Sequence, residues 1–402
     1  MSSIRSTLRR AGAFAAAAAF AAACAFGAAS VRAADQKPIV IGAAVSLTGA
    51  YADGGKYTLQ GYELWVKQQN AHGGLLGRKL ELKTYDDQSD ASVGIRLYEK
   101  LVNEDHVDLL AGPYGSALTA PTSNVAARYK MVMFCPEDAA PVTFDRGNRY
   151  IFQGLPQAVH YVDGVMAMAK ARALKTVALV GEDTPFPHAI GSAVPELAKS
   201  DGMTVVLTEY YPHNTSDFSA LVQKIKAANP DVLLAASFVP DSIALLRQLK
   251  QADVAPKMVY EAIGGSDPAF GPAAGKDADG VLSSTAWSAD LKTPGNGEFV
   301  KSFTAEYGRA PDYHSASSFA GLTVLAEAVK RAGGLDQEKI REQLASMKME
   351  TLFGQYSVDP SGKQVGYQAY AQQWQGGRQV IVYPESHAQG KLKFPFASWR
   401  GR

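Results

Sequence analysis

The stretch DLLAGPYGSALTAPTSN, from Asp108 to Asn124, holds the unit from which this chain is built. A short apolar run predicts a buried strand, and the small and polar residues from Ser116 onward predict a helix. The turn between them reads GPYGS (112–116), although one glycine would suffice for an ordinary connection. Because glycine lets the backbone approach a ligand closely and a helix N-terminus presents free N–H groups, this turn is a candidate anion-binding site.

The same strand-to-helix unit repeats on both sides of this stretch. Upstream, IVIGAAVSL (39–47) and KLELKTYDD (79–87) predict strands, and YTLQGYELWVKQQN (57–70) and ASVGIRLYEKLVNE (91–104) predict helices. Downstream, strands are predicted by KTVALVGED, MTVVLTEYY, PDVLLAASF and KMVYEAI, each separated by a segment of helix length. This alternation predicts an α/β fold with parallel sheets that are covered by helices on both faces.

The alternation breaks around APVTFDRGNRYIFQGLP (140–156) and then restarts, which predicts two doubly wound lobes with a first boundary near Leu155. After the glycine-rich segment 264–280, VLSSTAWS predicts one more strand. Two helical stretches follow, and YQAYAQQWQGGRQVIVYP then predicts a hairpin centred on its Gln-Gly-Gly-Arg run.

The first 33 residues have the pattern of a secretory signal peptide. Arg5, Arg9 and Arg10 precede an alanine-rich apolar run, and cleavage is expected near Ala33. A membrane anchor is a weaker alternative, because the run is barely long enough to span a bilayer. Lipidation of Cys24 also stays open, although a lipobox prefers leucine three positions earlier. Removal of the signal leaves Cys135 without a second cysteine, so no intramolecular disulfide is expected.

Composition and motifs exclude several classes of function. The whole chain has 402 residues and a formal net charge of +1, so we expect neither nucleic acid nor a membrane surface as a partner. The sequence contains no G-x-G-x-x-G, G-x-S-x-G, H-E-x-x-H or C-x-x-C motif. GPAAGK (271–276) is one residue short of a phosphate-binding loop. The seven histidines are scattered, and we expect no metal, no cofactor and no catalysis.

Several strand ends carry residues that could surround a ligand. The segments SLTGAYADGG, FCPEDAAP, GEDTPFP, ASFVPD and EAIGG all follow predicted strands, and ligands bind outside the carboxyl ends of parallel strands. They would converge if the two lobes faced each other. The aromatic residues Tyr114, Phe186 and Phe238 are therefore either ligand walls or simple loop packing, and Ser116 either binds an anion or caps its helix.

Four segments together resemble the type I periplasmic binding proteins that deliver branched-chain amino acids and related compounds to ABC transporters. They are IVIGAAVSLTGAYADGG, NAHGGLLGRKLELKTYDDQSD, LLAGPYGSALTAPTSNVA and VPDSIALLRQLKQA. The resemblance implies two lobes joined by a three-crossover hinge, the third crossover lying near Phe353 and Gly354. It implies a first lobe of 38–155 plus 285–353, a second lobe of 156–284 plus 354–390, and a C-terminal tail of 391–402.

The resemblance also implies a set of ligand-binding residues. Ser116 matches the serine that binds the ligand carboxylate, and Glu137 and Ala139 match the next binding loop. Ala139 stands where amino-acid binders usually have threonine, and Phe186 and Phe238 stand where tyrosine is frequent. Glu261 approximately matches the acid that holds the ammonium group. The predicted site is therefore Tyr114, Gly115, Ser116, Glu137, Ala139, Phe186, Phe238 and Glu261.

The expected function is capture of a small carboxylate-bearing ligand between the lobes, in the periplasm, for an ABC importer whose permease subunits lie in the inner membrane. A branched-chain or other hydrophobic amino acid is the first expectation. An aromatic or hydrophobic carboxylate without an ammonium group is the alternative, because the missing hydroxyls disfavour a buried charge. A ligand-sensing receptor domain and a secreted hydrolase are alternatives from other classes. The mature protein is expected to be a monomer.

The N-terminus can be tested directly. Mass spectrometry of protein recovered from the periplasm is expected to find a chain that begins at or near Ala34 and carries no lipid. A mature chain that begins with a diacylated Cys24 would contradict this expectation.

Overall fold

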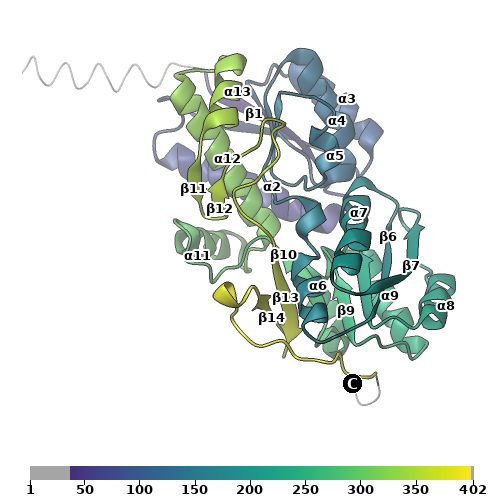
Figure 1. Cartoon of the computed structure of the whole chain (residues 1–402). Coiled ribbons are helices and arrows are strands. Elements are labelled where there is room, and N and C mark those ends of the chain that lie inside the picture. Colours follow the sequence, from purple (N-terminus) through teal and green to yellow (C-terminus); the bar gives the residue numbers. More distant parts are fainter. Residues whose placement is uncertain (1–36, 400–402) are drawn as a thin grey trace, which may run out of the picture.

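The computed structural model describes residues 37–399, which form two α/β lobes stacked one above the other in Figure 1. Each lobe contains its own sheet, and the chain passes from one lobe to the other more than once. This arrangement confirms the predicted fold class. The predicted signal peptide lies outside the described residues. Among those that are described, no helix is both long enough and apolar enough to cross a bilayer.

The sheet of the first lobe has five strands in the order β2-β1-β3-β4-β5, and all neighbouring pairs are parallel. Their carboxyl ends therefore meet at one edge of the sheet. The strands are β1 (Ile39–Val45), β2 (Leu80–Asp86), β3 (Leu109–Ala111), β4 (Met133–Cys135) and β5 (Ile151–Gln153).

Helices cover both faces of this first sheet. Leu110 and Met133 pack with α3 and α4 on one face, whereas their neighbours Leu109 and Phe134 pack with α2 and α12 on the other. The helices α12 and α13 come from a distant part of the sequence and return beside the N-terminal strand β1 (Figure 1). The helices of this lobe are α2 (Ala52–Ala71), α3 (Ala91–Asn103), α4 (Ser116–Tyr129), α5 (Pro141–Phe144), α11 (Asn296–Tyr307), α12 (Tyr313–Ala332) and α13 (Gln337–Ser346).

The sheet of the second lobe has seven strands in the order β14-β13-β10-β9-β8-β6-β7. The strands from β6 to β10 are parallel, and β13 and β14 add an antiparallel edge. The predicted hairpin is confirmed, because Gly376 and Gly377 join β13 to β14 with φ of 58° and 79°, as a type I′ turn requires. The strands are β6 (Thr176–Glu182), β7 (Thr204–Tyr211), β8 (Val232–Ala236), β9 (Met258–Glu261), β10 (Leu282–Thr285), β13 (Tyr370–Gln375) and β14 (Arg378–Tyr383).

Helices and a C-terminal extension complete the second lobe. Phe396 and Trp399 are buried in its core, and the Trp399 indole N–H donates to the Val254 carbonyl at 2.7 Å. The α-helices are α6 (Asp163–Lys170), α7 (Pro185–Ser200), α8 (Ser219–Ala228), α9 (Val239–Gln251) and α10 (Phe270–Ala274). The 3₁₀ turns are η1 (Ala158–His160), η2 (Gly264–Ser266), η3 (Gly275–Ala278) and η4 (Glu385–His387).

Two segments differ from the expectations set by the sequence pattern and by the family resemblance. The stretch 140–156, where the alternation of predicted strands and helices breaks, still contributes α5 and the edge strand β5. The chain also does not pass straight to the second lobe at Gly354, because β11 (Met349–Thr351) and β12 (Gly354–Tyr356) form a small hairpin there. The Gln364 N–H still contacts Gln153 of the first lobe at 3.0 Å. We therefore propose that the third crossover lies after Gln364.

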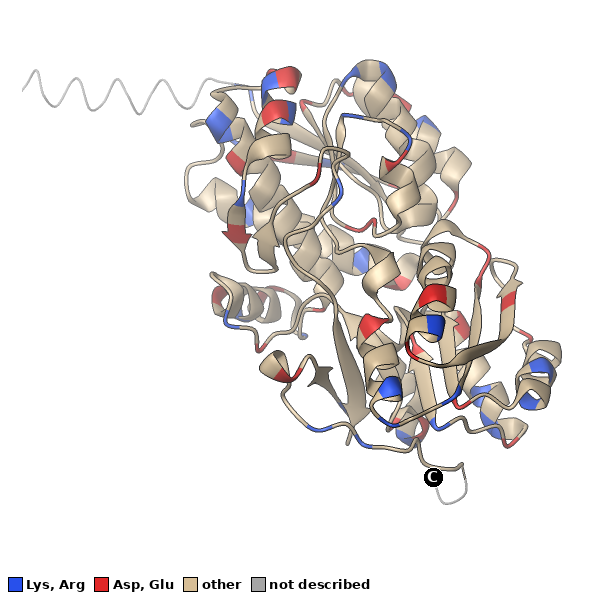
Figure 2. Ribbon diagram, in the orientation of Figure 1, with Lys and Arg blue, Asp and Glu red and all other residues tan. Residues whose placement is uncertain are grey.

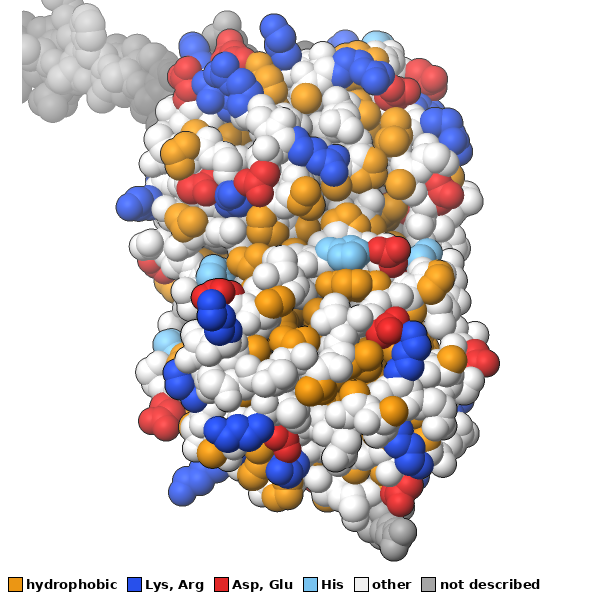
Figure 3. Space-filling model, turned by 45° about the vertical axis from the view of Figure 1, so that its right-hand side comes forward, with side chains coloured by type: hydrophobic (Ala, Val, Ile, Leu, Met, Phe, Trp, Pro, Cys, Tyr) orange, Lys and Arg blue, Asp and Glu red, His pale blue; other side chains and the backbone are white. Residues whose placement is uncertain are grey.

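Charged side chains are mixed over the surface of both lobes. Figure 2 shows Lys and Arg interspersed with Asp and Glu in the upper and the lower lobe. Figure 3 shows hydrophobic side chains gathered along the waist between the lobes on the face in view.

The helices α2 and α12 approach closely because Gly61 has no side chain. A Cβ atom on Gly61 would clash with the backbone carbonyl of Ser315 and would lie 2.8 Å from the Ser318 Cβ atom. The Trp65 indole N–H donates to Thr323 Oγ1 at 3.0 Å one turn further along the same contact. Gly61 therefore sets the distance between the two helices.

Replacement of Gly61 by alanine should destabilise the first lobe. The added methyl group meets backbone that cannot move without separating α2 from α12, so we expect a loss of about 1–3 kcal/mol in the free energy of unfolding. Gly297→Ala in α11 is the matched control, because nothing lies within 4 Å of its added Cβ and alanine favours a helix by up to about 1 kcal/mol. Thermal melting of both variants measures the difference. Equal melting temperatures would contradict the proposed role of Gly61.

Candidate functional site

A small cavity lies between the carboxyl ends of the two sheets. Its volume is about 20 Å³, which is room for about one water. Loops that follow β3 and β4 of the first lobe meet loops that follow β6, β8 and β9 of the second. Its walls are Tyr114, Gly115, Ser116, Glu137, Ala139, Leu155, Phe186, Phe238, Ile263, Tyr313 and His314.

The N-terminus of α4 opens into this cavity. Gly115 is the N-cap residue, with φ of 78° and ψ of 153°, and no side chain caps the helix. A capping role for Ser116 is therefore wrong. Its hydroxyl oxygen instead accepts the backbone N–H groups of Ala139 and Ala140 at 3.3 and 3.2 Å, which ties α4 to the loop after β4. The first N–H groups of α4 stay available to an anion in the cavity.

A carboxylate and an imidazole form a buried pair in the wall of the cavity. The Nδ1 atom of His314 lies 2.6 Å from Oε2 of Glu137, and the two side chains are 3 % and 0 % exposed. Ser318 donates to Oε1 of Glu137 at 3.1 Å. Burial raises the pKa of Glu137 well above its usual value, and the nearby Asp312 adds to this effect. Burial also lowers the pKa of His314 to about 3.

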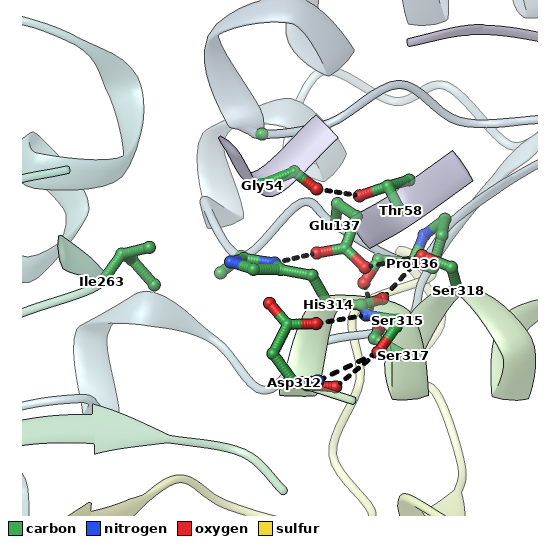
Figure 4. Close-up of polar contacts among 12 residues, drawn as sticks. Gly54, Thr58, Pro136, Glu137, Ile263, Asp312, His314, Ser315, Ser317 and Ser318 are labelled. Atoms are coloured by element: carbon green, nitrogen blue, oxygen red, sulfur yellow. Dashed lines mark hydrogen bonds and ion pairs between the residues drawn. The ribbon is translucent and has the colours of Figure 1, made fainter. Parts of the chain in front are cut away.

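The second ring nitrogen of His314 faces the interior of the cleft. Figure 4 shows the His314 ring between Glu137 on one side and Ile263 of the second lobe on the other. Within the part of the chain that the structure describes, Nε2 has no hydrogen-bond partner. The sequence analysis missed His314, because a single histidine in a helical pattern looks like an ordinary core residue. A signal could have come from the largely polar run Asp312–Ser318, which precedes the apolar stretch at the middle of the same helix.

Aromatic rings form the remaining walls of the cavity. The Phe186 and Phe238 ring centroids are 6.0 Å apart, and Tyr161 packs edge-on against Phe186 at 5.5 Å. Tyr51 links this group to the first lobe, at 5.1 Å from Phe238 and 6.2 Å from Tyr114. The cavity is thus largely apolar, with its polar groups concentrated on the first lobe.

Glu261 does not line the cavity with the other predicted residues. It lies at the end of β9, where Oε2 accepts the Ser237 hydroxyl at 2.6 Å. Burial raises the pKa of Glu261 to about 8, so the carboxyl group is mostly protonated at neutral pH. Glu261 is therefore not one of the residues that line the cavity. The predicted residues that the structure does bring together there are Tyr114, Gly115, Ser116, Glu137, Ala139, Phe186 and Phe238.

One polar contact joins the two lobes at the edge of the cleft. The Tyr51 hydroxyl donates to Oε1 of Glu182 at 2.9 Å, and His213 Nδ1 lies 2.8 Å from Oε2 of the same carboxylate. The Tyr51 ring also packs on His213 with centroids 4.9 Å apart. Tyr51 follows β1 of the first lobe, whereas Glu182 and His213 belong to the second. This contact therefore stabilises the closed arrangement of the lobes.

The chain is similar to known binding proteins over most of its length. A sequence model of the family described as "Periplasmic binding protein" matches residues 38–379. The Leu/Ile/Val-binding protein homolog 7 of Brucella suis is 26% identical over 380 residues, which cover 89% of this chain and 94% of that protein.

Two of the solved structures that share the fold carry different ligands. A branched-chain amino acid substrate-binding protein from Streptococcus pneumoniae in complex with isoleucine has a TM-score of 0.79 and 21% identity, and the match covers 89% of this chain and 100% of the other. An ABC transporter solute-binding protein from R. palustris in complex with benzoate has a TM-score of 0.77 and 20% identity, with 86% and 96% covered.

Tyr51→Phe should weaken closure without unfolding either lobe. The variant loses one hydrogen bond between the lobes, worth about 0.5–1.5 kcal/mol, so the population of open molecules should rise. Small-angle scattering of the ligand-free protein is expected to show a larger radius of gyration. Tyr85→Phe is the control, because its hydroxyl donates to Asp105 at 2.9 Å within the first lobe. An equal effect of both variants would refute the role assigned to Tyr51.

Proposed function

Because the chain belongs to the periplasmic binding protein family, we propose that it is the solute-binding component of an ABC importer and captures small hydrophobic carboxylates between its lobes. The observation that carries this proposal is the cavity itself. A helix N-terminus and a serine hydroxyl face it from one lobe, and aromatic rings face it from the other. The first group of atoms suits a carboxylate and the second suits an apolar body.

The cavity favours an aromatic carboxylate over an amino acid. An ammonium group needs an ionised acid within reach, because an unpaired buried charge is costly. Glu261 lies behind the wall with a raised pKa, and Glu137 is engaged with His314 and Ser318. We therefore reverse the order that the sequence predicts and place aromatic carboxylates first. The R. palustris protein in complex with benzoate supports this order, whereas the protein in complex with isoleucine supports the second candidate.

Capture requires the lobes to open and close. The closed cavity has room for about one water molecule, so a ligand the size of benzoate must enter while the lobes are apart. We propose a hinge at the crossovers between the lobes, with the contact of Tyr51 and Glu182 re-formed around the bound ligand.

Membership of the family supports the location and the partners that we propose. The protein is periplasmic, and we propose that its signal peptide is cleaved near Ala33 and that the mature monomer delivers its ligand to permease subunits in the inner membrane. A hydrolase is disfavoured, because the Ser116 hydroxyl contacts two backbone N–H groups and the buried histidine contacts Glu137 instead. We propose no catalytic step.

Titration calorimetry with benzoate and L-leucine tests the proposed ligand. Wild type is expected to bind benzoate more tightly than leucine. Ser116→Ala removes a charge-assisted hydrogen bond and should weaken benzoate binding by about ten- to a hundredfold, or about 1.5–3 kcal/mol. Its melting temperature is measured separately, because the same change leaves two backbone N–H groups without this acceptor.

Glu261→Gln separates the two candidate ligands. It should leave benzoate affinity unchanged, since Glu261 does not line the cavity. Tighter binding of leucine than of benzoate, together with loss of leucine binding in Glu261→Gln, would restore the amino acid as the ligand. Binding of neither compound would count against the proposed ligand class.

A further inference from the structure

The His314 ring leaves one polar atom unsatisfied at the cavity wall. Its Nδ1 is held by Glu137, and the two nitrogens point to opposite sides of the ring, so Nε2 points away from Glu137 toward the cleft (Figure 4). The side chain is 3 % exposed, and Nε2 has no partner among residues 37–399. Buried polar atoms are nearly always hydrogen-bonded in native proteins. A partner for Nε2 is therefore expected from the ligand.

His314 lies beside the groups that would hold a carboxylate. Its ring packs edge-on against Tyr114 with centroids 4.9 Å apart, and Tyr114 immediately precedes the N-cap of α4. The loop after β4 contacts both α12 and α4, because Glu137 contacts His314 and the Ala139 N–H donates to the Ser116 hydroxyl. Nε2 and the N-terminus of α4 thus face the same small cavity from neighbouring positions.

The number of protons on the Glu137–His314 pair determines whether Nε2 is a hydrogen-bond donor or an acceptor. Burial favours the neutral forms of both side chains, so the pair holds two protons in total. One of these protons can lie between Oε2 and Nδ1, and the other then lies on Nε2. Nε2 is in that case a donor, which suits an anionic oxygen. Loss of one proton leaves the pair with a charge of −1 and a lone pair on Nε2, which repels a carboxylate.

We propose that Glu137 holds His314 through Nδ1 in the tautomer that carries its proton on Nε2, so that Nε2–H donates a hydrogen bond to the ligand carboxylate. Glu137 is a positioning residue, and His314 is a ligand-binding residue that determines specificity for anions. This inference rests on the proposed function, since it assigns the recognition of the carboxylate within the same cavity.

The surroundings of His314 contain acids and phenols. No cation is among the groups that shift the pKa of Glu137 or His314. Besides the N-terminus of α4, the proton on Nε2 is therefore the positive group that faces a ligand here, and affinity for a carboxylate should fall as rising pH removes it. The titratable groups around the pair are Glu137 and Asp138 from the loop after β4, Tyr114 before α4, Asp312 and Tyr313 beside His314, Tyr161 near Phe186, and Asp267 of the second lobe.

Three variants titrated with benzoate test the inference. His314→Phe keeps the ring shape but removes the donor, and its affinity is expected to fall about ten- to a hundredfold. Glu137→Gln can still donate to Nδ1 and keeps the proton on Nε2, so its affinity at neutral pH should stay within about threefold of wild type. Glu137→Ala leaves Nδ1 unpartnered and should resemble His314→Phe. Melting curves of the ligand-free variants show which of them are folded.

The pH dependence of benzoate affinity shows whether Glu137 positions His314 for the ligand or only supports the fold. Wild-type affinity for benzoate is expected to fall by up to about tenfold per pH unit once the pair loses its proton, whereas Glu137→Gln should have a flat profile. His188→Gln is the control, because it removes an exposed histidine that contacts Asp183 at 2.6 Å and should keep the wild-type profile.

Three results would overturn the inference while leaving the proposed function intact. They are wild-type affinity in His314→Phe, equal loss in Glu137→Gln and Glu137→Ala, or a wild-type affinity for benzoate that rises with rising pH. If wild type binds no benzoate at any pH, the proposed ligand class fails first, and the inference fails with it.

Discussion

The close contact of α12 with α2 at Gly61 determines where the polar groups of the cavity lie. The helix α2 begins directly after the loop that carries Tyr51, and α12 begins with the run that carries His314. Both helices therefore bring their N-terminal ends to the cleft, and their separation is set by a residue without a side chain. A wider spacing would move His314 away from Glu137 and would shift Tyr51 relative to the second lobe.

The electrostatics of the cavity follow from burial more than from paired charges. Glu137 and Glu261 both have raised pKa values because they are removed from water, and His314 has a lowered one for the same reason. The polar wall is thus made of neutral groups and of the partial positive charge at the N-terminus of α4. Such a wall accepts one negative charge from a ligand and offers no counterion for a positive one.

Sequence patterns predicted the architecture because parallel α/β folds place strands and helices in a regular order. They also indicated Ser116, Phe186 and Phe238, because residues directly after strands must lie at the carboxyl edge of a sheet. They did not predict His314 or the position of Glu261 behind the wall. Whether a side chain faces a cavity or its neighbours depends on packing between distant segments, as in the contact of Glu261 with Ser237. The edge strand β5 was missed because three residues carry too little periodicity.

The order in which the chain completes its lobes has a consequence for when this protein can fold. One face of the first sheet lacks α12, which covers it together with α2, until residue 332 has been made, and the core of the second lobe lacks Phe396 and Trp399 until almost the whole chain exists. An N-terminal portion leaving the ribosome therefore lacks part of the hydrophobic core of each lobe. For a periplasmic protein this delay is useful, since a chain without a completed core can still be threaded across the inner membrane.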